Sequence, residues 1–405
     1  MGRWGYVEIP LLQHVGEPSR PVVKVGDTVA RGQRIAERVG KYGANIHSSV
    51  SGLVVNISEA IHIDVDGNQP DSFLEIPKTS TKLEAIEEAG VVGAALMGFP
   101  AHIKLRADLS AHPSGGCVIA NAAECEPGRR HNVKLVEDTP EIVIEGLLHC
   151  MDITGAAKGY VAISRGQERA IAAMERACAP HPNIQLMENM APTYPVGDER
   201  VLVRELLGHV LAPGELPQSV GVLVFNVETL KRIAQAIDIR KPVMDKDFTL
   251  NGRIADVFLS GEPKVFLDEP MGYPVAKYIE EAGGYQEPYG ELVLGGGAFK
   301  GYRGVDTEVV TKRMASIFVS MPFSEDRRRF GVLACECGAR EDRLGQIVES
   351  MGGVVVSESF CKRMEPDEHG RLRCNKPGVC PGQAETVLEF KNQGAQAILV
   401  GSCED

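Results

Sequence analysis

Apolar and polar residues alternate in short runs along the first part of the chain. Between residues 22 and 57 these runs are separated by turn-forming pairs such as Gly26-Asp27 and Ser51-Gly52. Successive side chains of a strand point to opposite faces, and such pairs suit the tight turns between strands. The pattern therefore predicts β-hairpins over residues 1–78.

From residue 79 to residue 240 the pattern changes to alternating helices and strands. Thr139-Pro140-Glu141 is a helix start, because it combines a capping hydroxyl, a proline at the first helical position and an acid in the first turn. Strands are predicted at residues 159–164 and 220–225. This alternation predicts an α/β sheet.

Residues 241–315 follow a third pattern. Short strands at 248–250 and 291–294 flank one helix, Val275–Glu281, which ends at a pair of glycines. This pattern predicts a small α+β module, which resembles β-grasp domains of the soluble-ligand-binding type. The hairpins of residues 1–78 resemble the flattened barrel-sandwich of lipoyl carrier domains.

Residues 316–405 form a second alternation of strands and helices. Apolar runs predict strands at residues 330–334, 354–356 and 397–400. Between the last two we expect a helix that starts at Pro381 and turns three residues inward, Ala384, Val387 and Leu388. A β-α-β-α-β order requires parallel strands, whose carboxyl ends meet at one edge of the sheet. The whole chain is thus expected to be a multidomain α/β and α+β protein with a cysteine-rich parallel α/β tail.

Six of the ten cysteines lie in this tail: Cys335, Cys337, Cys361, Cys374, Cys380 and Cys403. Cys335, Cys361 and Cys403 fall just past the carboxyl ends of the three predicted strands, at the edge where open α/β sheets build their sites. Thiolates gathered there ligate zinc or an iron–sulfur cluster, or cycle as a redox dithiol, and these alternatives stay open. All six are candidate metal ligands, and the candidate redox residues are Cys335, Cys337, Cys361 and Cys403. Cys380 precedes the predicted helix start, which would stabilise its thiolate.

Composition and charge set the class of protein. Apolar residues make up 43% of the chain and charged residues 24%, as in ordinary globular proteins. The formal net charge of −12 disfavours nucleic acid as the main partner, because that partner demands a basic surface. No apolar run reaches the roughly 18 residues of a spanning helix, and the first residues do not form a signal peptide. A cytoplasmic protein without a transmembrane segment is expected.

The end of the chain prompts a separate hypothesis. Asp405 closely follows a predicted buried strand, and no helix follows to cover the sheet. We expect that the functional polypeptide is longer and that a selenocysteine codon at position 406 was read as a stop.

Five motifs, in order, resemble the RnfC family, whose members are the C subunits of the Rnf electron-transport complex. That family is akin to the flavin- and NADH-binding subunit of respiratory complex I. The resemblance covers about residues 7–320, and the matching stretches are residues 9–16, 90–105, 121–128, 194–200 and 226–230.

The resemblance implies FMN and NADH as cofactors. It places Lys104 at the FMN phosphate, and Asn121 and Asn226 at polar atoms of the isoalloxazine ring or ribityl chain. Carboxylates of these motifs would bind ribityl or ribose hydroxyls, as carboxylates commonly do. The candidate cofactor-binding residues are Gly93, Gly98, Lys104, Asn121, Glu124, Tyr194, Gly197, Asp198, Glu199, Asn226 and Thr229.

The chain departs from the family in the glycine loop, where Ala95-Leu96-Met97 replaces Gly-Gly-Ala. Glycines there allow backbone to approach a phosphate closely, and larger side chains would crowd that approach. Ala123 replaces an acid of the complex I relatives, and the two iron–sulfur motifs of the usual RnfC protein are missing.

Three functions follow from these observations. We expect an electron-transfer protein, linked to NADH and flavin, that passes electrons through the tail cysteines to a partner reductase such as proline reductase. A first alternative is an inactive docking or scaffold protein with a structural metal site. A second is an RnfC-type component of an Rnf complex, held peripherally at the membrane.

Overall fold

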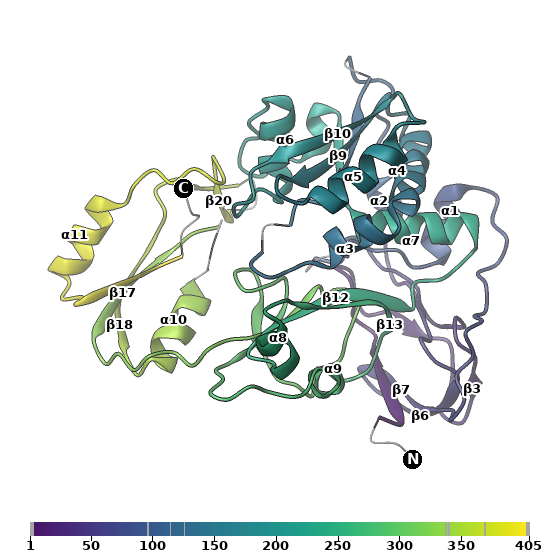
Figure 1. The fold of residues 1–405 in the computed structure, drawn as a ribbon, viewed down its shortest axis with the longest axis horizontal. Coiled ribbons are helices and arrows are strands. Elements are labelled where there is room, and N and C mark those ends of the chain that lie inside the picture. Colours follow the sequence, from purple (N-terminus) through teal and green to yellow (C-terminus); the bar gives the residue numbers. More distant parts are fainter. Residues whose placement is uncertain are drawn as a thin grey trace.

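The computed structural model describes residues 4–94, 97–113, 115–124, 126–336, 338, 341–367 and 370–401. Its first part is a β sandwich (Figure 1). One sheet has the order β1 (Tyr6–Pro10), β7 (Ala60–Val65), β6 (Gly52–Ile57) and β3 (Thr28–Val29). The other has the order β2 (Arg20–Pro21), β4 (Arg34–Glu37) and β5 (Ile46–His47). Val7, Ile35 and Ile63 belong to one buried apolar cluster, so the two sheets share a core.

The second part is an α/β domain with a parallel sheet. The strand order is β10 (Ile184–Met190), β9 (Lys158–Ser164), β8 (Cys117–Asn121) and β11 (Val222–Asn226). The helices are α1 (Lys82–Glu88), α2 (Ala101–Lys104), α3 (His131–Asp138), α4 (Pro140–Thr154), α5 (Glu168–Cys178), α6 (Glu199–Leu207) and α7 (Val227–Asp238). Pro140 stands at the first helical position of α4, as its sequence predicts. The expected α/β sheet is therefore confirmed.

The third part is a mixed five-stranded sheet with two short helices. Its order is β13 (Lys264–Pro270), β12 (Asp245–Gly252), β16 (Ser316–Val319), β14 (Leu292–Gly295) and β15 (Tyr302–Gly304). The helices are α8 (Ala255–Ser260) and α9 (Val275–Glu281). Helix α9 has the predicted bounds and is followed by two left-handed glycines, Gly283 and Gly284. Phe248 and Phe266 stack at the centre of this core and Tyr278 meets both rings edge to face, with ring centroids about 5 Å apart.

The tail has a parallel three-stranded sheet, as predicted. Its order is β18 (Val354–Phe360), β17 (Arg329–Ala334) and β21 (Ala397–Val400). Helix α10 (Glu341–Ser350) follows β17, and a hairpin of β19 (Met364–Pro366) and β20 (Leu372–Cys374) precedes α11 (Ala384–Asn392).

Two expectations about α11 are wrong. The helix starts at Ala384 rather than at Pro381, so Cys380 is not at its N-terminus. Val387 and Leu388 are exposed, and Ala384 is too, whereas Thr386 and Phe390 are the buried residues. Phe390 fills the space above Gly331 of β17, where an added Cβ would lie 2.5 Å from its ring. The long-range fit of one aromatic ring to one glycine decides which face of α11 turns inward.

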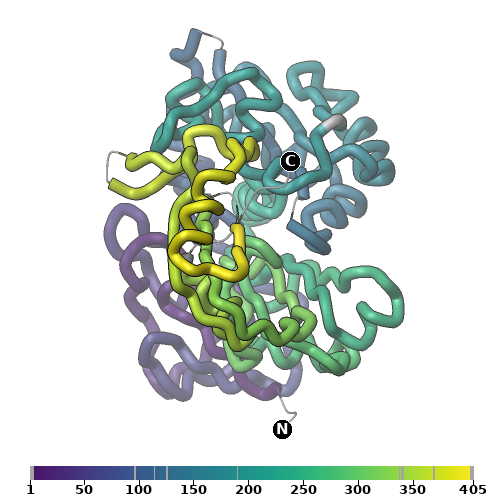
Figure 2. The backbone as a smooth tube through the Cα atoms, turned by 90° about the vertical axis from the view of Figure 1, so that its left-hand side faces the viewer, coloured from purple at the N-terminus to yellow at the C-terminus, as the bar shows by residue number. Residues whose placement is uncertain are grey.

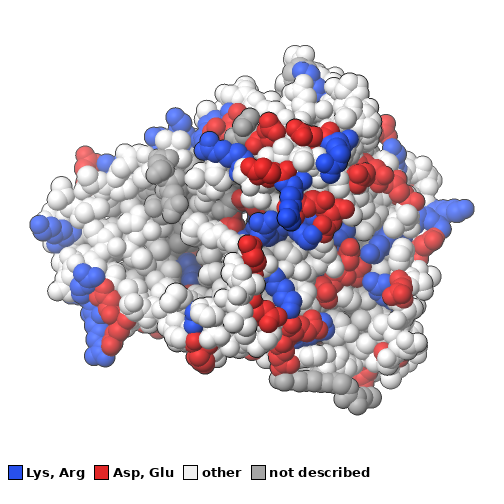
Figure 3. Space-filling model, viewed as in Figure 1, with Lys and Arg blue, Asp and Glu red and all other residues white. Residues whose placement is uncertain are grey.

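The tail lies beside both the α/β domain and the mixed sheet (Figures 1 and 2). Arg343 of α10 pairs with Glu291, next to β14. Arg204 of α6 donates to the carbonyl of Pro377 in the tail. On the face shown in Figure 3, Lys and Arg side chains intermingle with Asp and Glu. Within the described residues no helix has both the length and the apolar character needed to cross a membrane.

Candidate functional site

The carboxyl edge of the parallel sheet brings two of the predicted asparagines together. Asn121 ends β8 and Asn226 ends β11, and the two are paired in register on adjacent strands. The Asn121 amide donates to the Gly197 carbonyl at 2.9 Å. Asn226 caps α7 by accepting from the Glu228 backbone N–H at 2.9 Å. Three motifs that are distant in sequence therefore meet at this edge.

Lys104 lies under the same edge. Its Nζ is 2.7 Å from Glu199 Oε1 and 2.6 Å from the Val224 carbonyl, and it stands 5.1 Å from the centre of the Phe225 ring. The side chain is only partly exposed, so a cation is held between α2, α6 and β11. An ammonium in this place can neutralise a phosphate.

The N-terminus of α6 carries the next two predicted carboxylates. Asp198 caps the helix by accepting from the Arg200 backbone N–H at 3.0 Å, and Lys300 stands 3.4 Å from its other oxygen. Glu199 is the first residue of the helix and pairs with Lys104. Asp198 thus caps a helix, in addition to the cofactor-binding role that the sequence suggests.

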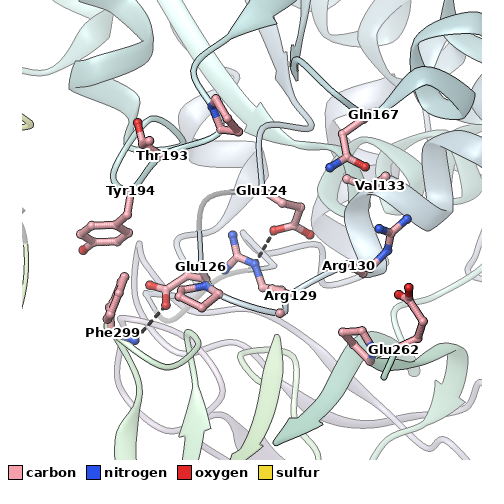
Figure 4. A pocket seen from close by; sticks show the side chains of 14 residues that line it. Glu124, Glu126, Arg129, Arg130, Val133, Gln167, Thr193, Tyr194, Glu262 and Phe299 are labelled. Carbon is pink, nitrogen blue, oxygen red and sulfur yellow. Dashed lines mark hydrogen bonds and ion pairs between the residues drawn. The ribbon is translucent and has the colours of Figure 1, made fainter. Parts of the chain in front are cut away.

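A pocket of about 470 Å³ opens between the α/β domain and the mixed sheet (Figure 4). Glu124 and Tyr194 line it, together with Thr193, Arg129 and Phe299. The rings of Tyr194 and Phe299 meet edge to face at 4.8 Å. Glu124 and Tyr194, two of the predicted site residues, therefore line the same pocket.

Glu124 is buried in this pocket wall and is not free for a ligand. It pairs with Arg129 at 2.5 Å and accepts from the Asn132 backbone N–H at 3.1 Å. Burial opposes its charge, but Arg129 and His131 outweigh burial and hold the pKa of Glu124 below its usual value.

Glu126, from the same motif, behaves differently. It accepts from the backbone N–H groups of Phe299 and Lys300 at 2.9 and 3.2 Å. Burial raises its pKa in spite of these bonds. The loop after β8 is thus bound to the loop after β14 through one carboxylate.

The glycine loop is held on both sides where it is described. Gly93 donates to the Phe99 carbonyl at 2.8 Å, and the Ala94 N–H donates to Thr229 Oγ1 at 3.0 Å. Gly98 has a φ of 58°, and an added Cβ would lie 2.9 Å from the Gln13 carbonyl. Met97 is 69% exposed, so its side chain is not packed into the site. Ala95 and Leu96 lie outside the described residues.

The tail brings four of the predicted cysteines together. Cys335 directly follows β17 and Cys361 directly follows β18, and both are buried with Cys374 in one small group that Cys380 also contacts. We call these four residues the cysteine cluster. The thiols of Cys335 and Cys361 hydrogen-bond one another, and Gln383 donates to Cys361 Sγ at 3.0 Å. Cys337 and Cys403 lie outside the described residues.

The surroundings of the cysteine cluster fit an additional ligand. Three buried polar atoms beside it have no hydrogen-bond partner: Arg363 Nε, Asn375 Oδ1 and Gln383 Oε1. Such atoms are rare in folded proteins unless they face a further group. Across the described residues, however, no three His, Cys, Asp or Glu side chains are grouped as metal ligands would be. The choice between a metal centre and a dithiol therefore rests in part on Cys337 and Cys403.

The sheet edge fits FMN by its donors. Lys104 supplies a cation, Asn121 and Asn226 supply amides, and Ser164, which ends β9 at the same edge, has a buried hydroxyl without a partner. These groups match a phosphate and the polar rim of a flavin.

Several residues that shape this region were not predicted from the sequence. Glu126 and Arg200 lie inside recognised motifs, and their charges were the available signal. Arg129 follows such a motif directly. Lys246 gave no signal, because a lysine in a strand is ordinarily solvated.

Two family models match the chain. The Nuo51 FMN-binding domain matches residues 86–235, and the RnfC barrel sandwich hybrid domain matches residues 5–73. The predicted barrel-sandwich and flavin-type domains are thereby confirmed.

Curated relatives extend the match. The C subunit of the Na⁺-translocating ferredoxin:NAD⁺ oxidoreductase complex of Acetobacterium woodii is 30% identical over 307 residues, which are 72% of this chain and 67% of that one. The corresponding protein of the proton-translocating complex of Clostridium ljungdahlii is 33% identical over 72% of this chain and 65% of its own. The cobalamin reductase PduS of Salmonella typhimurium is 33% identical over 50% of this chain and 41% of its own.

A solved NAD⁺-reducing [NiFe]-hydrogenase in the H₂-reduced state shares a TM-score of 0.47 and 22% identity, over 59% of this chain and 46% of that one. This likeness is too partial to bear on function.

Proposed function

The chain belongs to the RnfC family of electron-transfer oxidoreductase subunits, and on that premise we propose that it moves electrons from NADH to a partner reductase through its tail cysteines. It spans about two thirds of the length of the two Rnf relatives and less than half of the cobalamin reductase. The reaction, the partner and a cytoplasmic location are therefore proposed for this chain and are not taken over from those relatives.

One contact carries the proposal. Arg200 Nη1 of α6 lies 3.6 Å from Glu336 Oε2, and Glu336 directly follows Cys335. Glu336 also accepts from Arg373 and from the backbone N–H of Cys374. The cysteine cluster is thus attached to α6, whose N-cap Asp198 and first residue Glu199 belong to the motif at residues 194–200. A donor at the sheet edge and an acceptor in the tail would be neighbours.

The chain's own residues prepare the sheet edge for FMN. Lys104 would hold the phosphate, and Asn121 and Asn226 would orient the flavin by hydrogen bonds to its polar atoms. FMN supplies a group that accepts a hydride from NADH and releases electrons one or two at a time.

At the tail, the contact between Cys335 and Cys361 supports a dithiol as the electron acceptor. The overall step is balanced: NADH, one proton and the Cys335–Cys361 disulfide give NAD⁺ and two thiols. The partner reductase then takes two electrons and two protons from the thiols, and the disulfide re-forms. We propose a partner of the proline reductase type for this last step.

The test is an anaerobic incubation of the oxidised, FMN-loaded protein with one equivalent of NADH, followed by alkylation and peptide mass spectrometry. We expect new alkylation at Cys335 and Cys361, and none at Cys150, which is buried in α4. NADH oxidation with no new alkylation in the tail would contradict the dithiol.

A second candidate function is that of a peripheral component of an ion-translocating complex. The similarity to the two Rnf relatives favours it. Co-purification from detergent-solubilised membranes separates the candidates, because only the second predicts membrane proteins in the purified material.

A further inference from the structure

The backbone N–H and the backbone carbonyl of Ala94 are both held by residues outside the glycine loop. The Ala94 N–H donates to Thr229 Oγ1 at 3.0 Å, and the Ala94 carbonyl accepts from Lys246 Nζ at 3.3 Å. Ala94 directly follows Gly93, at the start of the loop that the family uses for flavin. The two contacts therefore fix the two peptide groups that flank the Ala94 Cα.

Lys246 reaches the loop from another part of the molecule. It lies in β12 of the mixed sheet and is 1% exposed. A buried ammonium is costly unless it is paired and hydrogen-bonded. Its ion-pair partner is Glu228 Oε2 of α7, which is also 1% exposed. Glu228 precedes Thr229, so the residues that hold Ala94 are joined to one another.

The other carboxylate oxygen of Glu228 accepts a hydrogen bond from the backbone of β12. Glu228 Oε1 accepts from the Asp247 backbone N–H at 3.0 Å, which attaches α7 to β12 directly beside Lys246. The position of the ammonium is therefore set by the backbone of both elements. A simple packing role would need none of these polar contacts, because an apolar side chain of the same length would fill the space at less cost.

We infer that Lys246 is a positioning residue, which holds the Ala94 carbonyl so that the glycine loop keeps the shape that a flavin requires. Its role toward FMN rests on the proposed function, and its role toward the loop does not. The mixed sheet thereby contributes to a site whose predicted cofactor-binding residues all belong to the α/β domain.

Lys231 provides a matched control. It is buried in the same group of charges, at 4% exposure, but its Nζ contacts Asp247 at 2.9 Å and Asp268 at 2.8 Å. Lys231→Met therefore removes a buried ammonium from the network, whereas Lys246→Met also removes the contact with the loop.

The experiment is amide hydrogen exchange of the full-length apo protein, followed in peptides that contain Ala94. We expect the Ala94 N–H to exchange faster by about tenfold in Lys246→Met, because loss of the bond to the neighbouring carbonyl lets this part of the loop open more often; the factor is that of one lost hydrogen bond to a charged group. Lys231→Met should exchange at Ala94 like the wild type. Equal protection in Lys246→Met and the wild type, or equal loss in both variants, would overturn the inference.

A second measurement separates this inference from the proposed function. The dissociation constant of FMN, from quenching of flavin fluorescence, should rise by about tenfold in Lys246→Met and stay unchanged in Lys231→Met. Failure of the wild type to bind FMN would sink the proposed function and leave the exchange result to decide on the loop. If Lys246→Met does not fold, Thr229→Val tests the opposite contact, and unchanged exchange at Ala94 would again contradict the inference.

Discussion

Arg200 of α6 and Glu336 of the tail stand 3.6 Å apart, with most of the Arg200 side chain buried. Arg200 also donates to the Leu211 carbonyl at 3.1 Å, so its guanidinium is fixed within the α/β domain. Glu336 is fixed in turn by Arg373 and by the backbone of Cys374. This charged pair and the nearby contact of Arg204 with Pro377 help to attach the cysteine cluster to the α/β domain.

Glu336→Gln should loosen the cysteine cluster from α6. The amide keeps its shape and can still accept from Cys374, but the charge that binds Arg200 and Arg373 is lost, at a cost of about 1–3 kcal/mol. Hydrogen exchange in the segment around Cys374 should become faster, and electron delivery from NADH to an external acceptor should slow. Glu349→Gln, an exposed change in the same tail, should do neither. An unchanged exchange rate in Glu336→Gln would show that the pair does not hold the tail.

Cys335→Ser should block electron delivery to an external acceptor but should leave the reduction of FMN by NADH unchanged. Serine keeps the size of the side chain but has no redox chemistry, so two-electron exchange with Cys361 becomes impossible. We expect the rate of NADH-dependent acceptor reduction to fall to background in a stopped-flow assay. Cys178→Ser, in α5, is the control, and its rate should match that of the wild type. Normal turnover by Cys335→Ser would remove the cysteine cluster from the path.

The reactivity of Cys361 should depend on pH in a defined direction. Burial raises the pKa of Cys361 above its usual value, and the bond from Gln383 only partly offsets it. The thiol is therefore protonated at neutral pH, and only the thiolate reacts. In metal-free, reduced protein, alkylation of Cys361 should be slow at about pH 7 and should accelerate only above the pH at which an ordinary cysteine thiol ionises. Rapid, pH-independent alkylation near neutral pH would contradict this protonation state.

Lys312 should make stability rise with pH. It is buried, it donates to the carbonyls of Asn45 and Gly90, and burial lowers its pKa to about 7. The unfolded chain binds one more proton than the folded chain between about pH 7 and pH 10.5, so the free energy of unfolding increases there by up to about 1.4 kcal/mol per pH unit. Below about pH 7 both states are protonated and this contribution stays constant.

Lys312→Met isolates this contribution. The variant loses two hydrogen bonds and should be less stable at about pH 9, but its free energy of unfolding should change less with pH than that of the wild type. Urea unfolding at several values between about pH 6 and pH 9 measures both. Parallel pH profiles of the two proteins would show that Lys312 keeps an ordinary pKa.

Local patterns were sufficient for much of the fold. The helix Val275–Glu281 and the strand Ala397–Val400 have the bounds that periodicity and glycines indicate. Local patterns could not predict which face of α11 turns inward, because that depends on how Phe390 packs against Gly331 in a strand about 60 residues away in sequence.

The candidate site shows the same division. The order of the motifs was enough to bring Asn121 and Asn226 to one sheet edge, since parallel strands align their carboxyl ends. The buried pair of Lys246 and Glu228 was not predictable. A charged residue in a strand or helix pattern indicates solvent, and only the packed structure shows two such residues buried against each other.

The proposed transfer of electrons from NADH to the cysteine cluster can be followed in the flavin spectrum. The measurement is an anaerobic visible spectrum of the full-length protein loaded with FMN. It is recorded during titration with NADH and then during addition of an oxidised partner or of a small-molecule disulfide in its place. In the wild type we expect flavin bands that bleach with NADH and return when the acceptor is added. In Cys335→Ser we expect bands that bleach but do not return. A flavin spectrum that NADH leaves unchanged, or that recovers equally in both proteins, would contradict the proposed transfer.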